Sequence, residues 1–242
     1  METKVPFAGC STGTVSSACA WWCDQDDCGR ASASSGPAFC PVHEDCLPAQ
    51  TLSLLRRLAP VAAESRLALG GGSACALRLG HRTSADLDLF ALEELDPPAL
   101  LSSLGAVGER RLRGISANEL TVVLDGVELS ATALGRPPLE DPAPWLGVAL
   151  LAAADLTELK VSAAVARGAM RDLCDLHLLC EEAGANLERA IRASEIDLVV
   201  ALKALTDRAR FAGQPALDLR RPWTVEAAVS WFEVQAQRLL TS

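Results

Sequence analysis

Apolar residues recur every three or four positions in several segments of the first half of the chain, which predicts helices. The first such segment is a leucine-rich stripe that Pro60 is expected to bend or end. The second segment is closed by Gly80, and the third starts with two prolines. The expected helices span residues 50–63, 73–79 and 97–104.

A period of two, which is typical of strands, appears between and after these helices. It is clearest at residues 86–90, where Asp86 and Asp88 alternate with leucines. Asp125 and Gly126 separate two later runs and form a strong hairpin signal. The other expected strands span residues 66–69, 111–115, 119–124 and 127–133.

The second half of the chain has a different pattern. Prolines and glycines cluster at residues 135–147, which predicts a loop that joins two parts of the protein. After Asp155 the chain is expected to be helical almost to its end, and Asp155 and Glu158 have the spacing of a capping box. The last helix is expected near residues 224–240. The pattern predicts an α+β fold with a mixed sheet, followed by an all-helical part. The expected divisions are a Cys-rich extension at 1–46, an α/β domain at 47–150 and a helical domain at 151–242.

Composition narrows the class of protein. The 242 residues are 50% hydrophobic and 22% charged, which excludes wholesale disorder and a coiled-coil rod. The net charge of -9 argues against binding to nucleic acid through bulk charge alone. No window of about 18 apolar residues is free of charge, so no membrane helix is expected. The apolar stretch at the start is too short for a signal peptide, so a cytoplasmic location is expected.

Residues 67–90 carry the clearest chemical signal: a strand, three glycines, a short helix and a second strand with two carboxylates. Glycines allow a ligand to approach the backbone, and Ser73 lies where the helix is expected to begin, so free N–H groups there can receive a phosphate. Asp86 and Asp88 share one face of their strand and suit one or two Mg²⁺ ions. A tight turn and a solvated strand face are the alternatives for each feature taken alone.

A second cluster of charges lies on the helices expected after residue 155. Asp172 and Asp175 share a helix face, Arg171 and Asp175 form an i,i+4 pair, and Lys160 lies one helix earlier. One interpretation is a salt-bridge network that locks the helices together. The other is that Lys160 neutralises triphosphate oxygens while Asp172 or Asp175 positions a reacting group. Both can hold at once.

The segment Gly71–Phe90, GGSACALRLGHRTSADLDLF, resembles the signature of the nucleotidyltransferase superfamily. More narrowly, it is similar to the AbiEii/AbiGii toxin family, with Ser73 in place of the usual threonine. A second block, Asp155–Leu179, resembles that family's second motif. The marked positions of this motif are Lys160, Arg167, Gly168, Arg171, Asp172 and Asp175.

This resemblance implies an enzyme that transfers a nucleotide from an NTP, with Mg²⁺ or Mn²⁺ as cofactor. It implies the toxin of a type IV-like toxin–antitoxin or abortive-infection system, with RNA, particularly tRNA, as acceptor and a cognate antitoxin as partner. The implied catalytic residues are Asp86 and Asp88, which hold the metal, with Lys160, Asp172 and Asp175. The implied nucleotide-binding residues are Gly71, Gly72, Ser73, Arg82, Lys160, Arg167 and Arg171. The candidate arginines for an RNA contact are Arg110, Arg111 and Arg113, or Arg78 with Arg82.

One position departs from the superfamily pattern. Ser130 stands where a later strand usually supplies a third carboxylate, and Glu128, two residues earlier on the same strand face, is the candidate replacement and a candidate metal ligand. This departure keeps an alternative open. The protein would then be a degenerate nucleotidyltransferase that binds a nucleotide or a partner without turnover.

The first 46 residues are rich in cysteine. With His43, these cysteines offer enough soft ligands for one zinc ion, although their spacing matches no standard zinc motif. A disordered extension is the alternative. The six cysteines are Cys10, Cys19, Cys23, Cys28, Cys40 and Cys46. His81 is expected to be a polar loop residue, and His177 is expected to be packed in the core.

Overall fold

The computed structural model describes residues 42–241, and these residues form one compact unit. The described part of the chain contains one sheet of seven strands, in the order β3-β4-β5-β2-β1-β7-β6. The sheet is mixed, because β2 pairs with β5 and β1 with β7 in parallel, while the other pairs are antiparallel. The strands are β1 (Leu67–Leu69), β2 (Leu87–Ala91), β3 (Arg110–Ile115), β4 (Glu119–Leu124), β5 (Val127–Ala133), β6 (Ala143–Trp145) and β7 (Val148–Leu150).

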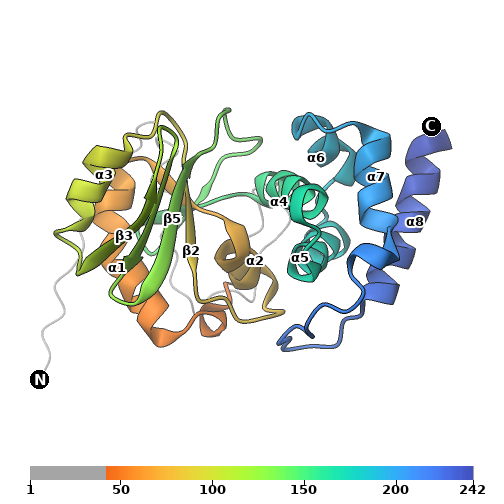
Figure 1. Cartoon of the computed structure of the whole chain (residues 1–242), viewed down its shortest axis with the longest axis horizontal. Coiled ribbons are helices and arrows are strands. Elements are labelled where there is room, and N and C mark those ends of the chain that lie inside the picture. Colours follow the sequence, from red (N-terminus) through yellow and green to blue (C-terminus); the bar gives the residue numbers. More distant parts are fainter. Residues whose placement is uncertain (1–41, 242) are drawn as a thin grey trace, which may run out of the picture. The chain divides into compact units, whose positions relative to one another are not determined.

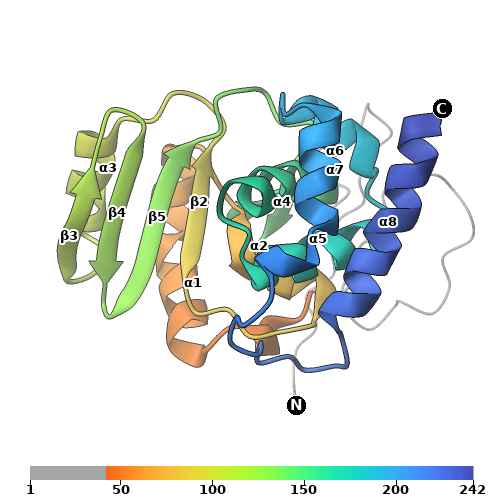
Figure 2. The same cartoon turned by 45° about the vertical axis from the view of Figure 1, so that its right-hand side comes forward.

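Helices cover the sheet on both faces (Figure 1). Helices α1 and α3 lie against one face, while α2, α4 and α5 lie on the other side of β2. Figure 2 shows β3, β4 and β5 side by side with α1 and α3 behind them. The helices are α1 (Ala49–Glu64), α2 (Gly71–Leu79), α3 (Pro97–Leu104), α4 (Ala153–Arg167), α5 (Met170–Glu181), α6 (Leu187–Ala193), α7 (Leu198–Thr206) and α8 (Val225–Thr241). This arrangement confirms the predicted α+β class.

Two hydrophobic clusters hold the unit together. The larger cluster packs the sheet against α1, α2 and α3, and Leu156 and Leu178 extend it into the helical part. The smaller cluster lies among α4 to α8 and includes Phe232, which is fully buried. The last residues of the predicted extension also belong to the packed unit, because Val42 contacts the core and Cys46 is buried. The three predicted domain divisions stay a prediction.

Most strands appear where the sequence predicts them. Asp125 and Gly126 have φ values of +47° and +82°, as the two central residues of a type I′ hairpin turn require, so the hairpin prediction is confirmed. Strands β6 and β7 were not expected, because residues 135–147 read as a loop and residues 148–150 were assigned to no strand. Strand β6 shows why. It has three residues, one of them Pro144, and lies at the edge of the sheet, where a short strand shows no period of two.

Two helix starts differ from expectation, whereas the first helix agrees with its predicted span of 50–63 to within one residue at each end. Helix α2 begins at Gly71, two residues earlier than predicted, and α1 continues through Pro60 to Glu64. The capping-box prediction is wrong, because α4 begins after Ala152 and no side chain caps it. The buried Asp155 carboxylate instead accepts a hydrogen bond from the backbone N–H of Leu139 at 2.8 Å, which fixes the loop before β6. Within residues 42–241, no helix is both long and apolar enough to cross a membrane.

Candidate active site

The two carboxylates of the sequence signal lie at one end of a parallel strand pair. Asp88 on β2 is the register partner of Ser130 on β5, and the Ser130 hydroxyl donates a hydrogen bond to Asp88 Oδ1 at 2.8 Å. Asp86 comes just before β2, and Glu128 comes two residues before Ser130 on the same strand face. Ser130 therefore stands beside the carboxylate pair, at the position that the sequence assigned to a third carboxylate.

The start of α2 approaches Asp88 closely. Gly71 has φ of +56°, and a Cβ atom there would overlap the Asp88 carboxylate, so this position requires glycine. The backbone N–H of Gly72 donates a hydrogen bond to Asp88 Oδ2 at 3.3 Å. The positive end of the α2 dipole is thus directed at the carboxylate pair, where an anionic ligand would meet it.

The side chain of Ser73 does not point into the cleft, where a phosphate contact would require it. Its side chain is fully buried, and its hydroxyl hydrogen-bonds to the Asp86 carbonyl oxygen and to the Ser84 hydroxyl. Ser73 is also absent from the lining of the cleft. The Ser73 hydroxyl therefore ties α2 to the segment before β2, and Ser73 itself does not reach the cleft.

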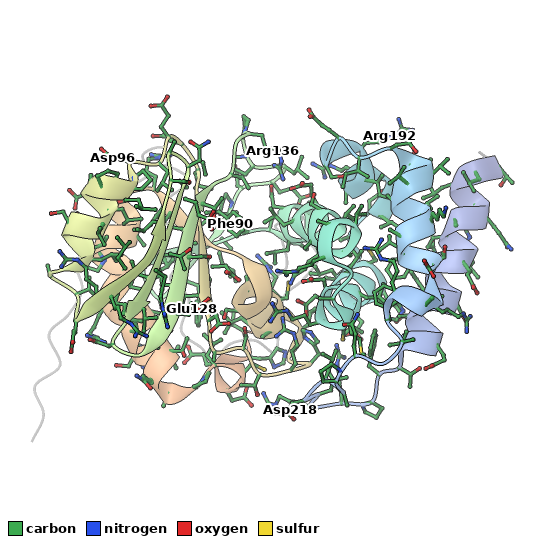
Figure 3. All side chains as sticks on the ribbon, viewed as in Figure 1. Phe90, Asp96, Glu128, Arg136, Arg192 and Asp218 are labelled. Carbon is green, nitrogen blue, oxygen red and sulfur yellow. The ribbon has the colours of Figure 1, made fainter. Side chains whose placement is uncertain are left out.

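A cleft of about 360 Å³ brings the predicted residues of both motifs together. Strands β2 and β5 and the residue just before β2 supply its carboxylates, among them Glu128, which Figure 3 labels. Helices α4 and α5 and the segment after α2 supply its cations. The lining residues are Gly71, Gly72, Arg82, Ser84, Asp86, Leu87, Asp88, Phe90, Glu128, Ser130, Thr132, Leu159, Lys160, Ala163, Arg167 and Arg171.

Two buried carboxylates, Asp172 and Asp175, form ion pairs with the cations that line the cleft. Lys160 Nζ lies 3.0 Å from Asp172 Oδ1 and 2.6 Å from Asp175 Oδ2. Arg167 forms a bidentate ion pair with Asp172, in which Nε lies 2.6 Å from Oδ2 and Nη2 lies 2.8 Å from Oδ1. Asp172 and Asp175 are fully buried and are absent from the cleft lining. The structure therefore places these two carboxylates behind the cations, in the salt-bridge network that was one of the two interpretations of this motif.

Asp175 is the centre of the network. Arg82 donates to both of its oxygens at 2.8 Å, and His81 Nε2 lies 2.8 Å from Oδ1. Burial alone would raise the pKa of Asp175, but Lys160 and Arg82 hold it well below its usual range. Although burial by itself would lower the pKa of Lys160, Asp175 and its other neighbours raise it. Both groups are therefore charged at neutral pH.

The two histidines have different outcomes. His81 lies in the loop after α2, as expected, but its side chain is fully buried and contacts Asp175. His177 is packed as expected. Its Nδ1 atom is 3.3 Å from the indole Nε1 of Trp223, its ring packs edge-on against Trp231, and burial lowers its pKa.

The carboxylates on the sheet side of the cleft repel one another. Burial, followed by the nearby charges of Glu128 and Asp88, raises the pKa of Asp86. The described residues contain no group of three His, Cys, Asp or Glu side chains arranged to hold a metal ion. Mg²⁺, however, binds through one or two carboxylates together with water and substrate phosphates. Asp86 and Asp88 fit a magnesium ion of that kind, because a divalent cation would relieve their repulsion.

Replacing Asp86 with asparagine is expected to raise the melting temperature of the metal-free protein at neutral pH. Since the folded-state pKa of Asp86 is raised, stability is lost as the pH rises from the unfolded-state pKa through the folded-state pKa, and the amide removes this loss. Calorimetry of both proteins at about pH 4 and about pH 8 checks this expectation. The gain should be larger at the higher pH, and a lower melting temperature for Asp86→Asn at both pH values would contradict it.

Ser130→Asp is expected to tighten Mg²⁺ or Mn²⁺ binding by at least about tenfold, because a third carboxylate then stands beside Asp88. The metal-free variant should be less stable than the natural protein, since the added charge has no cation to face. Thr121→Asp is the matched control, because Thr121 pairs with Ser130 from the far side and lies one strand further from Asp88. Equal metal affinities in both variants would show that Ser130 does not adjoin the ion.

Most of the candidate zinc ligands lie outside the residues that the structure describes. Cys10, Cys19, Cys23, Cys28 and Cys40 lie outside the described residues. Cys46 is buried, and its sulfur accepts a hydrogen bond from Arg220 at 2.9 Å. The zinc site stays a prediction.

The sequence analysis missed one end of the cleft. It is lined by Phe90, Thr132, Leu159 and Ala163, none of which was singled out. Signals for them were present, because Phe90 follows Asp88 by two residues on the same strand face. Leu159 and Ala163 are four residues apart on one face of α4, beside Lys160.

Comparison with solved structures identifies the fold. JHP933 from Helicobacter pylori is 18% identical, with a TM-score of 0.52 over 81% of this chain and 92% of that chain. A "putative nucleotidyltransferase" from H. pylori is 18% identical, with a TM-score of 0.53 over 78% of this chain and 94% of that chain. The described residues thus have the nucleotidyltransferase fold.

Sequence comparison gives the family. The uncharacterized protein aq_aa25 of Aquifex aeolicus (strain VF5) is 30% identical over 146 residues, which cover 57% of this chain and 71% of that protein. The chain belongs to the same family as aq_aa25. No family model matches the chain.

Proposed function

We propose that the protein transfers a nucleotide from an NTP to an acceptor hydroxyl in the cleft. One observation carries this proposal. Asp86 and Asp88 on the sheet face Arg82, Lys160, Arg167 and Arg171 across one cavity that the start of α2 borders. A triphosphate with a divalent cation needs this distribution of charge, with carboxylates for the metal and cations for the phosphate oxygens.

In the proposed reaction, the acceptor oxygen attacks the α-phosphorus, the bond from that phosphorus to the bridging oxygen breaks, and pyrophosphate leaves. Asp86 and Asp88 would hold Mg²⁺ or Mn²⁺, which would supply charge neutralisation for the phosphates. Lys160, Arg82, Arg167 and Arg171 bind the phosphate oxygens, together with the backbone N–H groups of Gly71 and Gly72. Glu128, which is exposed in the same cleft, accepts the proton of the attacking hydroxyl.

In this proposal Asp172 and Asp175 are positioning residues. They touch the cations and not the cleft, so their contribution is to hold Lys160, Arg82 and Arg167 at fixed positions. Preorganised cations stabilise a transition state without reorganisation during the reaction, which is the largest electrostatic term in many enzymes. This role unites the two interpretations of the charge cluster.

The biological role that we propose is that of a toxin similar to the AbiEii/AbiGii family, with RNA or tRNA as acceptor and an antitoxin as partner. The two sequence blocks that resemble this family support the proposal. The exposed arginines of β3, Arg110, Arg111 and Arg113, lie on the edge strand of the sheet and support an anionic acceptor. Arg78 does not support it, because its guanidinium donates to the Leu151 carbonyl oxygen at 2.6 and 3.0 Å.

A binding protein without turnover is the second candidate, and Ser130 is the observation that favours it. Both candidates require NTP binding, and titration calorimetry with each NTP, with and without Mg²⁺, tests it. The proposal expects Mg²⁺-dependent binding that Asp88→Asn abolishes, followed by release of pyrophosphate when an acceptor is added. Binding without pyrophosphate release would favour the second candidate, and no NTP binding would contradict both.

A further inference from the structure

The cleft changes chemical character along its length. Along β2 and the residue just before it, the cleft-facing positions run from Asp86 through Asp88 to Phe90. On β5 they run from Glu128 through Ser130 to Thr132. Phe90 and Thr132 are register partners, so they form one row across the two strands. Residues two apart on a strand are separated by roughly 7 Å. The carboxylates therefore occupy one end of the strand pair, and an aromatic ring and a hydroxyl occupy the other.

Helix α4 repeats this change on the opposite wall. Its first turns are tied to the segment after β5, because Arg136 binds Asp155 at 2.9 Å and Glu158 at 2.8 Å. Its last residue, Arg167, lies close enough to Asp88 for their charges to interact. Leu159 consequently lies toward the end nearer Phe90, and Ala163 follows one turn later, between Leu159 and Arg167. In Figure 3, Arg136 and Phe90 are labelled above Glu128, in agreement with this order.

The ring of Phe90 is held in place. A Cβ atom on Gly70 would overlap Cδ2 and Cε2 of the ring, so one ring edge packs directly on the glycine backbone. The rest of Phe90 is half-buried, and Leu159 and Ala163 are half-buried as well. Among the described residues, Phe90 is the one aromatic side chain in the cleft lining. A fixed ring between aliphatic walls offers nothing to a phosphate, but it suits a flat heterocycle, which can stack on it.

We propose that this end of the cleft, formed by Phe90, Leu159, Ala163 and Thr132, binds the base of the nucleotide. The base stacks on Phe90 and packs against the two aliphatic side chains, with the Thr132 hydroxyl at its edge. The triphosphate then extends past Gly71 and Gly72 toward Lys160 and the arginines. This inference rests on the proposed function, since it assigns the orientation of the NTP in the same cleft.

Titration calorimetry with NTPs and with inorganic tripolyphosphate, both with Mg²⁺, separates the two ends. Phe90→Leu keeps an apolar side chain but removes the stacking surface, so NTP affinity should fall about tenfold while tripolyphosphate affinity stays the same. Arg171→Ala is the contrasting variant and should weaken both ligands. Thr132→Val should change the order of preference among ATP, CTP, GTP and UTP.

Ala163→Phe keeps the test decisive if Phe90→Leu does not fold. Ala163 is half-buried on α4, so a larger side chain there should be tolerated by the fold and should fill the proposed base site. NTP affinity should fall, and tripolyphosphate affinity should not. If both Phe90→Leu and Ala163→Phe bind NTP as the natural protein does, the orientation is wrong while the proposed function stands. If the natural protein binds neither ligand, the proposed function itself fails.

Discussion

Asp175→Ala is expected to lower the free energy of unfolding by about 3–5 kcal/mol, because it leaves buried cations without their counter-charge. Asp175 lies 2.6 Å from Lys160 and 2.8 Å from both Arg82 and His81, and these four side chains are at most 10% exposed. For a unit of this size the loss corresponds to a fall in melting temperature of roughly 10 °C. Chemical denaturation and calorimetry measure both quantities.

Glu233→Ala is the matched control for Asp175→Ala. Glu233 also pairs with an arginine, Arg208, but both side chains are about half exposed, at 47% and 52%. Its removal should cost no more than about 1 kcal/mol. If Asp175→Ala were no more destabilising than Glu233→Ala, the network would not be a structural centre.

The Asp175 contribution should also depend on pH in a defined direction. Its folded-state pKa is depressed by Lys160 and Arg82, so the stabilisation is fully present above the unfolded-state pKa of about 3.9 and is lost as the pH falls below it. The free energy of unfolding of Asp175→Asn should therefore fall less, as the pH is lowered below about 4, than that of the natural protein does.

Asp88→Asn is expected to reduce the rate of nucleotide transfer by about a thousandfold or more, since several kcal/mol of charge stabilisation depend on this carboxylate. Asp88 accepts hydrogen bonds from the Gly72 backbone N–H at the start of α2 and from the Ser130 hydroxyl, and it also lines the cleft. The amide keeps its size, so the fold should survive. Initial rates of pyrophosphate release at saturating NTP measure the effect.

Asp96→Asn serves as the control for this loss of transfer. Asp96 caps α3 through a hydrogen bond to the Ala99 backbone N–H at 3.0 Å, and asparagine caps helices equally well. Its rate should equal that of the natural protein. A rate for Asp88→Asn within a few-fold of the control would remove Asp88 from the reaction.

Local sequence patterns predicted the elements that bring the cleft together. The alternation around Asp86 and Asp88 depends only on neighbouring residues, and so does the hairpin at Asp125 and Gly126. The sequence motif predicted that Ser130 occupies the position of a third carboxylate. The register between β2 and β5 places Ser130 beside Asp88. These features could be predicted because short-range spacing determines which face of a strand a side chain occupies.

The partners of Asp175 could not be predicted in the same way. His81 and Arg82 lie more than 90 positions before it in the sequence, and nothing in their local pattern distinguishes a buried ion pair from a polar loop. The Ser73 hydroxyl was misplaced for a related reason, since its partners, Ser84 and Asp86, come from a segment that folds back on α2. Such contacts depend on how the helices pack on the sheet, which the sequence pattern alone does not give.

The most direct test of nucleotide transfer in the cleft uses each α-labelled NTP with Mg²⁺ and total tRNA. Asp86→Asn and Lys160→Ala, at opposite walls of the cleft, are assayed beside the natural protein. We predict label on the RNA with the natural protein and its loss in both variants. No label on RNA or protein, despite measurable NTP binding, would contradict transfer and leave a nucleotide-binding protein.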